Sequence, residues 1–407
     1  MANSVKSQLR TLLDAPMAPF YFVIASVGFL VGLGTLMVLS SSSVIAQSEG
    51  RSPYYYVIRQ LVFLTIGLVG AWVLSRFRIN MLTKLGWPVW ILAAILLMLV
   101  LTPLGVDVGG NRNWLALGPI QIQPSEFAKL ALVVFAGSVL HRKRRLLHEP
   151  LHLVMPFIPA GLILLFLVLA GRDVGTGTVV AAIFALILWF IGTPLRILIP
   201  LSALGAAVIG LLVFGSSNRM RRIEIWLDPA SNTDLSSQPM SALYALASGG
   251  WWGTGLGASR QKWGGLKTGA HTDYIFAVIG EELGLFGVLA VIAAFAILAY
   301  AGFSIARRSD ALFTQIVAGG ITGWFLTQAI INIFVVLHLL PVLGVPLPFM
   351  SYGGSALLAN LLAVGVLLAC ARQTPAAQRY LASKKRQKKN KRRRMTSVMA
   401  AAKGDEA

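Results

Sequence analysis

The sequence has few charged residues and a single cysteine, and each shortage excludes a class of protein. Only 12% of the 407 residues are charged, whereas an ordinary soluble domain carries about 25%. The hydrophobic content of 56% excludes an intrinsically disordered chain. The lone Cys370 excludes a secreted module held together by disulfides. The mean hydropathy of +0.74 therefore predicts a surface that largely faces lipid.

Acidic residues are also scarce, and the resulting net charge of +20 is concentrated at one end of the chain. Twelve of the 35 basic residues lie in residues 372–407, beside only two acids. This placement argues against nucleic-acid binding. We expect residues 373–407 to form a disordered cytoplasmic tail that binds anionic lipids or an acidic partner protein. A solvated tail that only reinforces the orientation is the alternative.

Apolar stretches of about 20 residues, the length that crosses a bilayer, recur ten times. Counting Lys and Arg in alternate short loops places both termini in the cytoplasm. We therefore expect an all-α integral membrane protein with about ten transmembrane helices. Residues 1–16 are expected to form a cytoplasmic segment and residues 17–372 the membrane domain. Within this domain, residues 215–272 are expected to form a large extracytoplasmic loop between helices seven and eight. The expected helix cores are Phe20 to Leu39, Val57 to Leu74, Trp87 to Leu104, Phe127 to Leu140, Met155 to Ala170, Thr176 to Ile191, Ile197 to Phe214, Tyr274 to Ala301, Phe313 to Leu340 and Ser355 to Cys370.

Five acidic residues lie at or just inside the ends of these apolar stretches, where a carboxylate is costly and is a functional candidate by default. They are Glu126, Asp173, Asp273, Glu281 and Glu282. The histidines on the outer side show no metal-ligand spacing, so no metal site is predicted.

Each of the outer candidates has an ordinary structural alternative. Glu126 and Lys129, spaced i, i+3 on one helix face, either form an ion pair or line a cavity for a polar headgroup. Asp173 and Asp273 either cap the helices that follow them or act on a ligand. In the second case Asp273 is a general base whose pKa rises on desolvation, with His271 as the other candidate base. One of the two deeper glutamates is expected to pair with a basic residue from another helix.

The long outer segment combines glycine and positive charge. Five glycines between Gly249 and Gly257 either bring backbone amides close to an anion or form a flexible loop. Six basic residues in the same segment favour an anionic ligand, and Gln238 opens a short helix that we expect to lie in the membrane interface. Ser351 offers a hydroxyl in a turn that is otherwise structural. The six basic residues are Arg219, Arg221, Arg222, Arg260, Lys262 and Lys267.

Five motifs in order resemble the SEDS family, the bacterial shape, elongation, division and sporulation proteins, with its FtsW branch the most similar. The resemblance runs from about Phe20 to Ala371. Trp251 and Trp252, a WLDP element and the long tail favour the division branch. The motifs are QPSE and AK within Asn113 to Leu130, RDVGT at Arg172 to Thr176, QKWG at Gln261 to Gly264, HTDYIFAVIGEELG at His271 to Gly284, and LPFMSYGGS at Leu347 to Ser355.

The resemblance implies a peptidoglycan glycosyltransferase that polymerises lipid II at the outer face of the bacterial cytoplasmic membrane, at the division septum. Its expected partners are a class B penicillin-binding protein, which is a transpeptidase, and other divisome proteins. Asp273 matches the family's catalytic aspartate. The expected substrate-binding residues are Arg112, Glu126, Lys129, Asp173, Gln238, His271 and Ser351.

The expected chemistry is inversion at the anomeric carbon with release of undecaprenyl diphosphate. Because that leaving group is already anionic, one base suffices where glycosidases need two carboxylates. Mg²⁺ or Mn²⁺ could assist, and no organic cofactor is expected. The alternatives are a RodA-type elongation polymerase, a lipid II flippase or transporter, and a division scaffold without activity.

Overall fold

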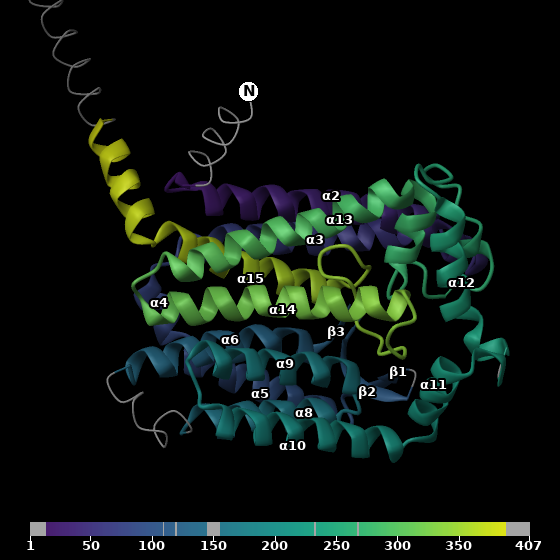
Figure 1. Cartoon of the computed structure of the whole chain (residues 1–407), viewed down its shortest axis with the longest axis horizontal. Coiled ribbons are helices and arrows are strands. Elements are labelled where there is room, and N and C mark those ends of the chain that lie inside the picture. Colours follow the sequence, from purple (N-terminus) through teal and green to yellow (C-terminus); the bar gives the residue numbers. More distant parts are fainter. Residues whose placement is uncertain are drawn as a thin grey trace, which may run out of the picture.

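The computed structural model describes residues 14–108, 110–118, 120–144, 155–231, 233–266 and 268–387. Its long helices run side by side along one axis, and the two ends of this bundle differ (Figure 1). One end carries α11 (Ser217–Leu227), α12 (Thr233–Gly249) and a small sheet, and we call it the loop end. The opposite end carries α4 (Ile79–Lys84) and the helix formed by residues 375–387, and we call it the tail end.

Each predicted apolar stretch lies on a helix. By length and composition, six helices in the described part of the chain can cross a membrane, namely α2, α3, α10, α13, α14 and α15, while α5, α8 and α9 are shorter apolar helices. The fold is therefore that of a multi-pass helical membrane protein, and the count of ten spans stays a prediction. The bounds are α2 Ala18–Ser48, α3 Tyr55–Leu74, α5 Gly86–Leu101, α6 Pro124–Arg142, α8 Phe157–Ala170, α9 Val174–Phe190, α10 Leu195–Phe214, α13 Ile275–Arg307, α14 Leu312–Val336 and α15 Gly354–Arg372.

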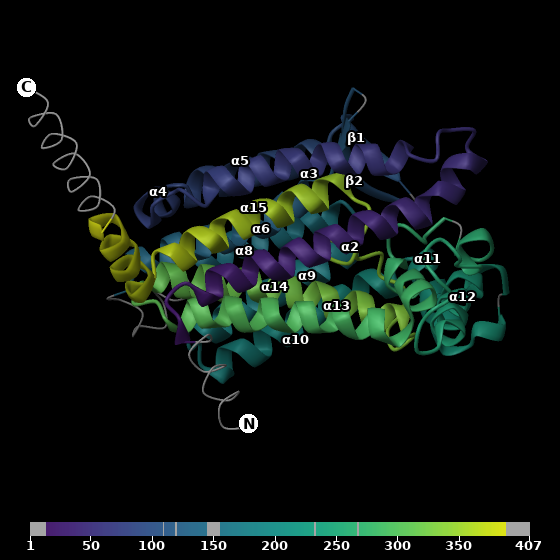
Figure 2. The same ribbon diagram turned by 90° about the horizontal axis from the view of Figure 1, so that it is seen from above.

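Two helices illustrate the difference between the centre and the edge of the bundle. Helix α6 packs against α5, α8, α9, α14 and α15, and almost all of its residues are buried. A helix that is surrounded on all sides in this way belongs to the core. In α10, by contrast, only Leu198 is buried, and the helix lies at the edge of the bundle in both views (Figures 1 and 2). Most of α10 is therefore free to contact lipid.

A three-stranded antiparallel sheet lies at the loop end, in the order β1 (Gly105–Val108), β2 (Asn111–Leu117), β3 (Ile120–Ile122). The sequence predicted an outer loop here, because strands this short carry little periodicity. Gly110 and Gly118 have φ values of 84° and 62° next to the strand ends, a conformation that favours glycine.

The long outer segment is mostly helical and contains α11, α12 and two single turns, η1 (Pro229–Ser231) and η2 (Gln261–Trp263). At the tail end, residues 375–387 form a helix, so the prediction of disorder from residue 373 is wrong for this stretch. Gln373 accepts a hydrogen bond from the Ile79 amide (2.7 Å) and donates one to the Phe77 carbonyl (2.9 Å), and Ala377 is buried. These contacts hold the start of the helix against the bundle. Residues 1–13 and 388–407, which include much of the basic run, lie outside the described residues.

Candidate active site

Asp173 is the N-cap of α9, and it also joins three segments of the loop end. Its Oδ1 accepts a hydrogen bond from the Thr176 amide (3.0 Å). Its Oδ2 accepts hydrogen bonds from Asn113 (2.9 Å), Gln123 (3.0 Å) and Ser125 (3.4 Å). The capping interpretation of Asp173 is therefore confirmed. Both oxygens of this buried carboxylate are already occupied, so a role in substrate binding stays a prediction.

Glu126 and Lys129 form the ion pair that their spacing allows. The Lys129 Nζ lies 2.8 Å from the Glu126 Oε1, and the side chains are 1% and 2% exposed. Lys129 also donates to Gln328 (2.9 Å) and lies 5.0 Å from the centre of the Trp324 ring. Gln328 in turn donates to the Pro346 carbonyl (2.9 Å). The pair thus connects α6 with α14 and the segment before α15.

Arg112 holds the sheet against the helices. Its guanidinium donates to the Thr102 carbonyl (2.5 Å), and its backbone amide donates to the Gly171 carbonyl (3.0 Å). These contacts fix β2 between the end of α5 and the turn before α9. They give Arg112 a structural role, and binding of a ligand by this residue stays a prediction.

His271 lies between two tyrosine rings, with its ring centre 5.1 Å from that of Tyr56 and 5.4 Å from that of Tyr352. The side chain is buried, and burial lowers its pKa to about 4. The imidazole is therefore neutral and a weak base at neutral pH. This favours Asp273 over His271 as the general base.

Ser351 and Gln238 fix the backbone close to these residues. Ser351 donates to the Thr272 carbonyl (2.6 Å) and accepts from the Leu347 amide (2.8 Å). Gln238 donates to the Thr268 hydroxyl (2.5 Å). Both residues thus position the segment that leads to Asp273, and direct contact with substrate stays a prediction for each.

Among the five candidate acids, Asp273 is the one whose carboxylate accepts no hydrogen bond from any residue that the structure describes. The capping interpretation is wrong, since α13 has its N-cap at Tyr274 and no side chain caps it. The Asn332 amide donates to the carbonyls of Asp273 and Val345 (2.8 Å each), which fixes the backbone. Burial raises the carboxyl pKa to about 6, although the positive charge of Arg222 lowers it.

Glu281 and Glu282 bind the glycine-rich segment to α13. Glu282 forms a buried ion pair with Lys262 (3.0 Å), and the Ser40 hydroxyl donates one hydrogen bond shared between its two carboxylate oxygens (2.7 and 2.8 Å). Glu281 accepts from the Ser259 hydroxyl (2.5 Å) and the Arg260 amide (2.8 Å). The expectation that one of them pairs with a basic residue is confirmed, although this residue comes from η2 and not from another long helix.

The glycines of this segment allow backbone to pack on backbone. A Cβ on Gly249 would lie 1.9 Å from the Gly280 carbonyl oxygen, and one on Gly253 would lie 2.2 Å from the Glu282 oxygen. Opposite them, α13 is broken at Gly284, which has φ 64° and ψ −163°. Close packing, rather than approach to a ligand, therefore explains Gly249 and Gly253.

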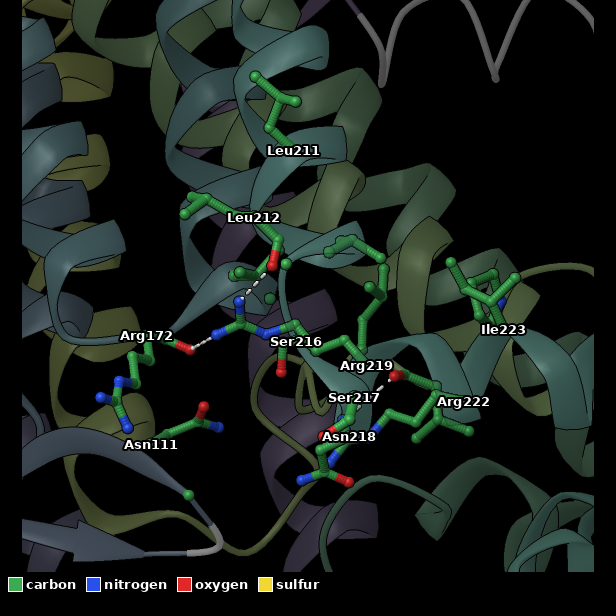
Figure 3. A pocket seen from close by; sticks show the side chains of 18 residues that line it. Asn111, Arg172, Leu211, Leu212, Ser216, Ser217, Asn218, Arg219, Arg222 and Ile223 are labelled. Carbon is green, nitrogen blue, oxygen red and sulfur yellow. Dashed lines mark hydrogen bonds between the residues drawn. The ribbon is translucent and has the colours of Figure 1, made fainter.

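Three arginines surround a cavity of about 630 Å³ at the loop end, which we call the arginine cavity (Figure 3). They are Arg172 from the turn before α9, and Arg219 and Arg222 from α11. Arg219 donates to the carbonyls of Leu212 (2.8 Å) and Arg172 (2.7 Å), and Arg222 donates to the Val342 carbonyl (3.2 Å).

The positive charge of the arginine cavity is only weakly neutralised by acidic residues in the described structure. Burial, Arg222 and Arg172 lower the pKa of Arg219, and only Asp173 raises it. Asp173 is already fully hydrogen-bonded, and Asp273 is close enough for Arg222 to influence its pKa. A cavity of this kind can bind an anion of two or more charges.

The sequence predicted part of this cavity. Arg219 and Arg222 belong to the basic segment that favoured an anionic ligand. Lys262 of the same segment is instead bound in its ion pair with Glu282. Lys267 lies outside the described residues. Arg172 was not among the predicted site residues, and its φ of 62° is visible only in the structure. In the described part of the chain, no group of three or more His, Cys, Asp or Glu could hold a metal ion.

The geometry defines a membrane protein with an unpaired carboxylate beside a cationic cavity at one end of a helical bundle. The model of the FtsW/RodA/SpoVE family, described as cell cycle protein, matches residues 21–376. The chain therefore belongs to this family, as the motifs predicted.

Named relatives cover most of the chain. The probable peptidoglycan glycosyltransferase FtsW of Mycobacterium tuberculosis is 35% identical over 376 residues, which are 91% of this chain and 71% of that protein. The protein of the same name from Nitrosococcus halophilus is 40% identical over 363 residues, or 87% and 92% of the two chains.

Solved structures show the same fold. One match has a TM-score of 0.70 and 27% identity, and it covers 87% of this chain and 98% of the other. That chain comes from a structure described as the structural coordination of polymerization and crosslinking by a peptidoglycan synthase complex. The rod shape determining protein RodA of Thermus thermophilus matches with a TM-score of 0.63 and 27% identity, covering 87% and 96%.

Proposed function

We propose that this chain is a peptidoglycan glycosyltransferase that joins lipid II units into glycan strands for septal wall synthesis in cell division. The loop end faces the outside of the cytoplasmic membrane, and both termini lie in the cytoplasm. The names of the FtsW relatives support this activity. The distribution of Lys and Arg among the short loops supports the orientation.

The isolated carboxylate of Asp273 is the observation that carries the proposal. Glu126 and Glu282 have lysine partners, and Asp173 and Glu281 are hydrogen-bonded. Among these five acids, Asp273 alone has a carboxylate without a hydrogen bond from the described residues, and burial raises its pKa to about 6. A general base works best when its pKa lies close to the operating pH.

Asp273 acts on the acceptor sugar. Its carboxylate takes the proton of the 4-hydroxyl of the terminal N-acetylglucosamine of one lipid II. The freed oxygen forms a bond to the anomeric carbon of the N-acetylmuramic acid of the growing chain, from the face opposite the leaving group. The bond from that carbon to the diphosphate breaks, the configuration inverts, and undecaprenyl diphosphate leaves. One base suffices because the leaving group needs no proton.

The arginine cavity stabilises the negative charge that develops on the leaving diphosphate. Fixed positive charges aimed at that position lower the barrier without reorganising during the step. Arg172, Arg219 and Arg222 line this cavity, whereas the predicted Arg112 and Lys129 do not, and Lys129 is paired with Glu126. No group of three or more His, Cys, Asp or Glu in the described residues could hold a metal ion by itself, and dependence on Mg²⁺ or Mn²⁺ stays a prediction.

The partner of the chain is a class B penicillin-binding protein that cross-links the new strands, together with other divisome proteins. The similarity to a chain of a peptidoglycan synthase complex supports such an assembly. Location distinguishes division from elongation. A tagged chain that gathers at the septum supports the division role, and one spread along the side wall supports the elongation role.

The decisive experiment is polymer formation from labelled lipid II by the purified protein with its partner. We expect Asp273→Asn to lower the rate by about 10²- to 10⁴-fold, the usual contribution of a general base. Glu224→Gln, which removes an exposed carboxylate from α11, is the matched control and should keep full activity. Full activity of folded Asp273→Asn would show that Asp273 is not the base.

A further inference from the structure

The backbone that leads to Asp273 is held in place by a distant part of the chain. Residues 337–353 connect α14 to α15 at the loop end, and we call them the α14–α15 segment (Figure 1). Three consecutive backbone carbonyls before α13 accept hydrogen bonds from α14 or from this segment. The donors are the Asn332 side chain to Asp273 (2.8 Å), the Ser351 hydroxyl to Thr272 (2.6 Å) and the Tyr352 amide to His271 (2.8 Å). Contacts across the bundle, rather than capping of α13, therefore set the position of Asp273.

The α14–α15 segment also forms a wall of the arginine cavity. Residues 341–343 line the cavity, and the Val342 carbonyl accepts a hydrogen bond from Arg222 (3.2 Å). A Cβ added at the next residue, Gly344, would lie 3.8 Å from the Asp273 Oδ2. Consecutive residues of one segment therefore line the cavity and flank the unpaired carboxylate.

Asn332 ties these two features together through one nitrogen atom. Its Nδ2 donates to the carbonyl of Asp273 and to that of Val345 in the segment (2.8 Å each). An amide NH₂ group has two hydrogens, so both are used on these two backbones. Asn332 is 1% exposed, and water does not readily replace a hydrogen bond that is lost at such a depth. Without this amide, the Asp273 backbone would be released from the segment.

We propose that Asn332 is a positioning residue of the glycosyl transfer, which holds Asp273 at a fixed distance from the arginine cavity by bonding its backbone to the α14–α15 segment. This role rests on the proposed function, in which Asp273 takes the proton of the acceptor and the cavity stabilises the leaving diphosphate. Inversion requires the attacking oxygen and the leaving group to lie on opposite faces of one carbon, so the protein groups that serve them need a fixed separation. An error of about 1 Å in such an arrangement can lower the rate about 10²-fold.

The neighbouring tether on α14 shows what is specific to Asn332. Gln328, about one turn earlier, donates to the Pro346 carbonyl (2.9 Å) and accepts a hydrogen bond from Lys129. It therefore anchors the α14–α15 segment to the ion pair of α6, but none of its hydrogen bonds reaches the start of α13. Among the described residues, Asn332 is the one whose side chain donates both to the segment and to the residue that carries the base.

The test is a double-mutant cycle on polymer formation from labelled lipid II by the purified full-length protein with its partner. Asn332→Leu removes the NH₂ group at a similar side-chain size, and it is measured alone and together with Asp273→Asn. Asn360→Leu is the matched control, because Asn360 is equally buried on α15 (1% exposed) and donates to none of the carbonyls described above. Ser351→Ala is a second variant, which removes the tether of the Thr272 carbonyl with the loss of a single oxygen atom.

We expect Asn332→Leu to lower the rate about 10- to 100-fold when Asp273 is present. In the Asp273→Asn background it should cost less than about threefold, because no base is left to position. Ser351→Ala should show the same pattern with a loss of about three- to tenfold, and Asn360→Leu should keep the wild-type rate. A merely structural role lowers the amount of active protein by the same factor in both backgrounds. Equal losses in the two backgrounds would therefore overturn the proposal.

The pH profile of Asn332→Leu alone gives an independent readout. The wild-type rate should fall below the Asp273 pKa of about 6. Arg222 and Tyr274 interact with this carboxylate, and from pH 5 to 8 Arg222 stays charged while Tyr274 stays neutral, because burial raises the pKa of Tyr274. A misplaced base contributes little, so the residual rate of the variant should lose most of this fall. A curve that is lowered by one factor at every pH would overturn the proposal.

Failure of this role and failure of the proposed function have different signatures. If Asp273→Asn keeps full activity, Asp273 is not the base, and both are wrong. If Asp273→Asn loses activity while Asn332→Leu costs the same factor with and without it, the base stands and the positioning role of Asn332 is wrong.

Discussion

The loop end contains two kinds of charged group, and they differ in what surrounds them. Four carboxylates have hydrogen-bonding or ionic partners: Glu126 on its own helix, and Asp173, Glu281 and Glu282 on other segments. We call them the paired acids. Asp273 has no hydrogen-bonding partner in the described part of the chain, and the cavity beside it collects positive charge. The paired acids hold segments together, and the unpaired groups remain available to a ligand.

This difference teaches that burial of an acid does not by itself identify a catalytic residue. The ion pair of Glu126 and Lys129 is almost completely buried, yet its contacts explain it as structure. Asp273 is more accessible, but the positive charge of Arg222 offsets the loss of water around its carboxylate only in part, so its pKa rises. The absence of a partner is the informative feature.

The largest expected loss of stability comes from breaking the buried ion pair of Glu126 and Lys129. Lys129→Met leaves the Glu126 carboxylate buried without its partner, which costs about 3 to 5 kcal/mol. We expect a large loss of folded protein and a lower thermal unfolding midpoint in detergent. The double variant Glu126→Gln with Lys129→Met should recover most of the loss, because no charge is left unpaired. A single variant as stable as the wild type would contradict a structural role for the pair.

Removal of the Asp173 side chain should also lower the stability of the protein, but by less. Asp173→Ala loses the cap of α9 and the contacts to Asn113 and Gln123, at a cost of about 2 kcal/mol. Thermal unfolding of the purified variant in detergent measures this. Glu224→Ala, at an exposed position of α11 at the same end, is the comparison and should change the midpoint much less. Equal midpoints for the two variants would show that the Asp173 contacts contribute nothing.

Removal of Asp273 should have the smallest effect on stability, and of opposite sign. The pKa of Asp273 is raised in the folded protein, so stability falls as the pH rises from about 4 to about 6 and stays reduced above that. Asn cannot ionise, so Asp273→Asn should be more stable than the wild type by on the order of 1 to 2 kcal/mol at pH 8. The gain should vanish below about pH 4. A variant that is less stable at pH 8 would place Asp273 among the paired acids.

The apolar composition predicted the helices well, because long apolar stretches have few structural alternatives. It missed the sheet from Gly105 to Ile122, whose strands are too short to show a period, and the helix of residues 375–387, whose start depends on contacts of Gln373 with a distant turn. Spacing predicted the Glu126 and Lys129 pair because both residues lie on one helix.

Other parts of the site depend on tertiary contacts that the spacing of residues along the sequence does not reveal. A capping Asp and a catalytic Asp look alike before a helix, and only the structure separates Asp173 from Asp273. The pairing of Lys262 with Glu282 requires the break of α13 at Gly284, which brings the glycine-rich segment close. Arg172 was missed because its neighbours in the cavity come from α11.

The pH dependence of polymer formation tests the central claim most directly. Asp273 accepts a proton only when it is ionised, and its pKa is about 6. With saturating labelled lipid II, the rate should be level above about pH 7 and fall about tenfold for each pH unit well below 6. The small residual rate of Asp273→Asn should lack this dependence. A wild-type rate that stays constant from pH 7 down to about pH 4.5 would contradict the assignment of Asp273 as the base.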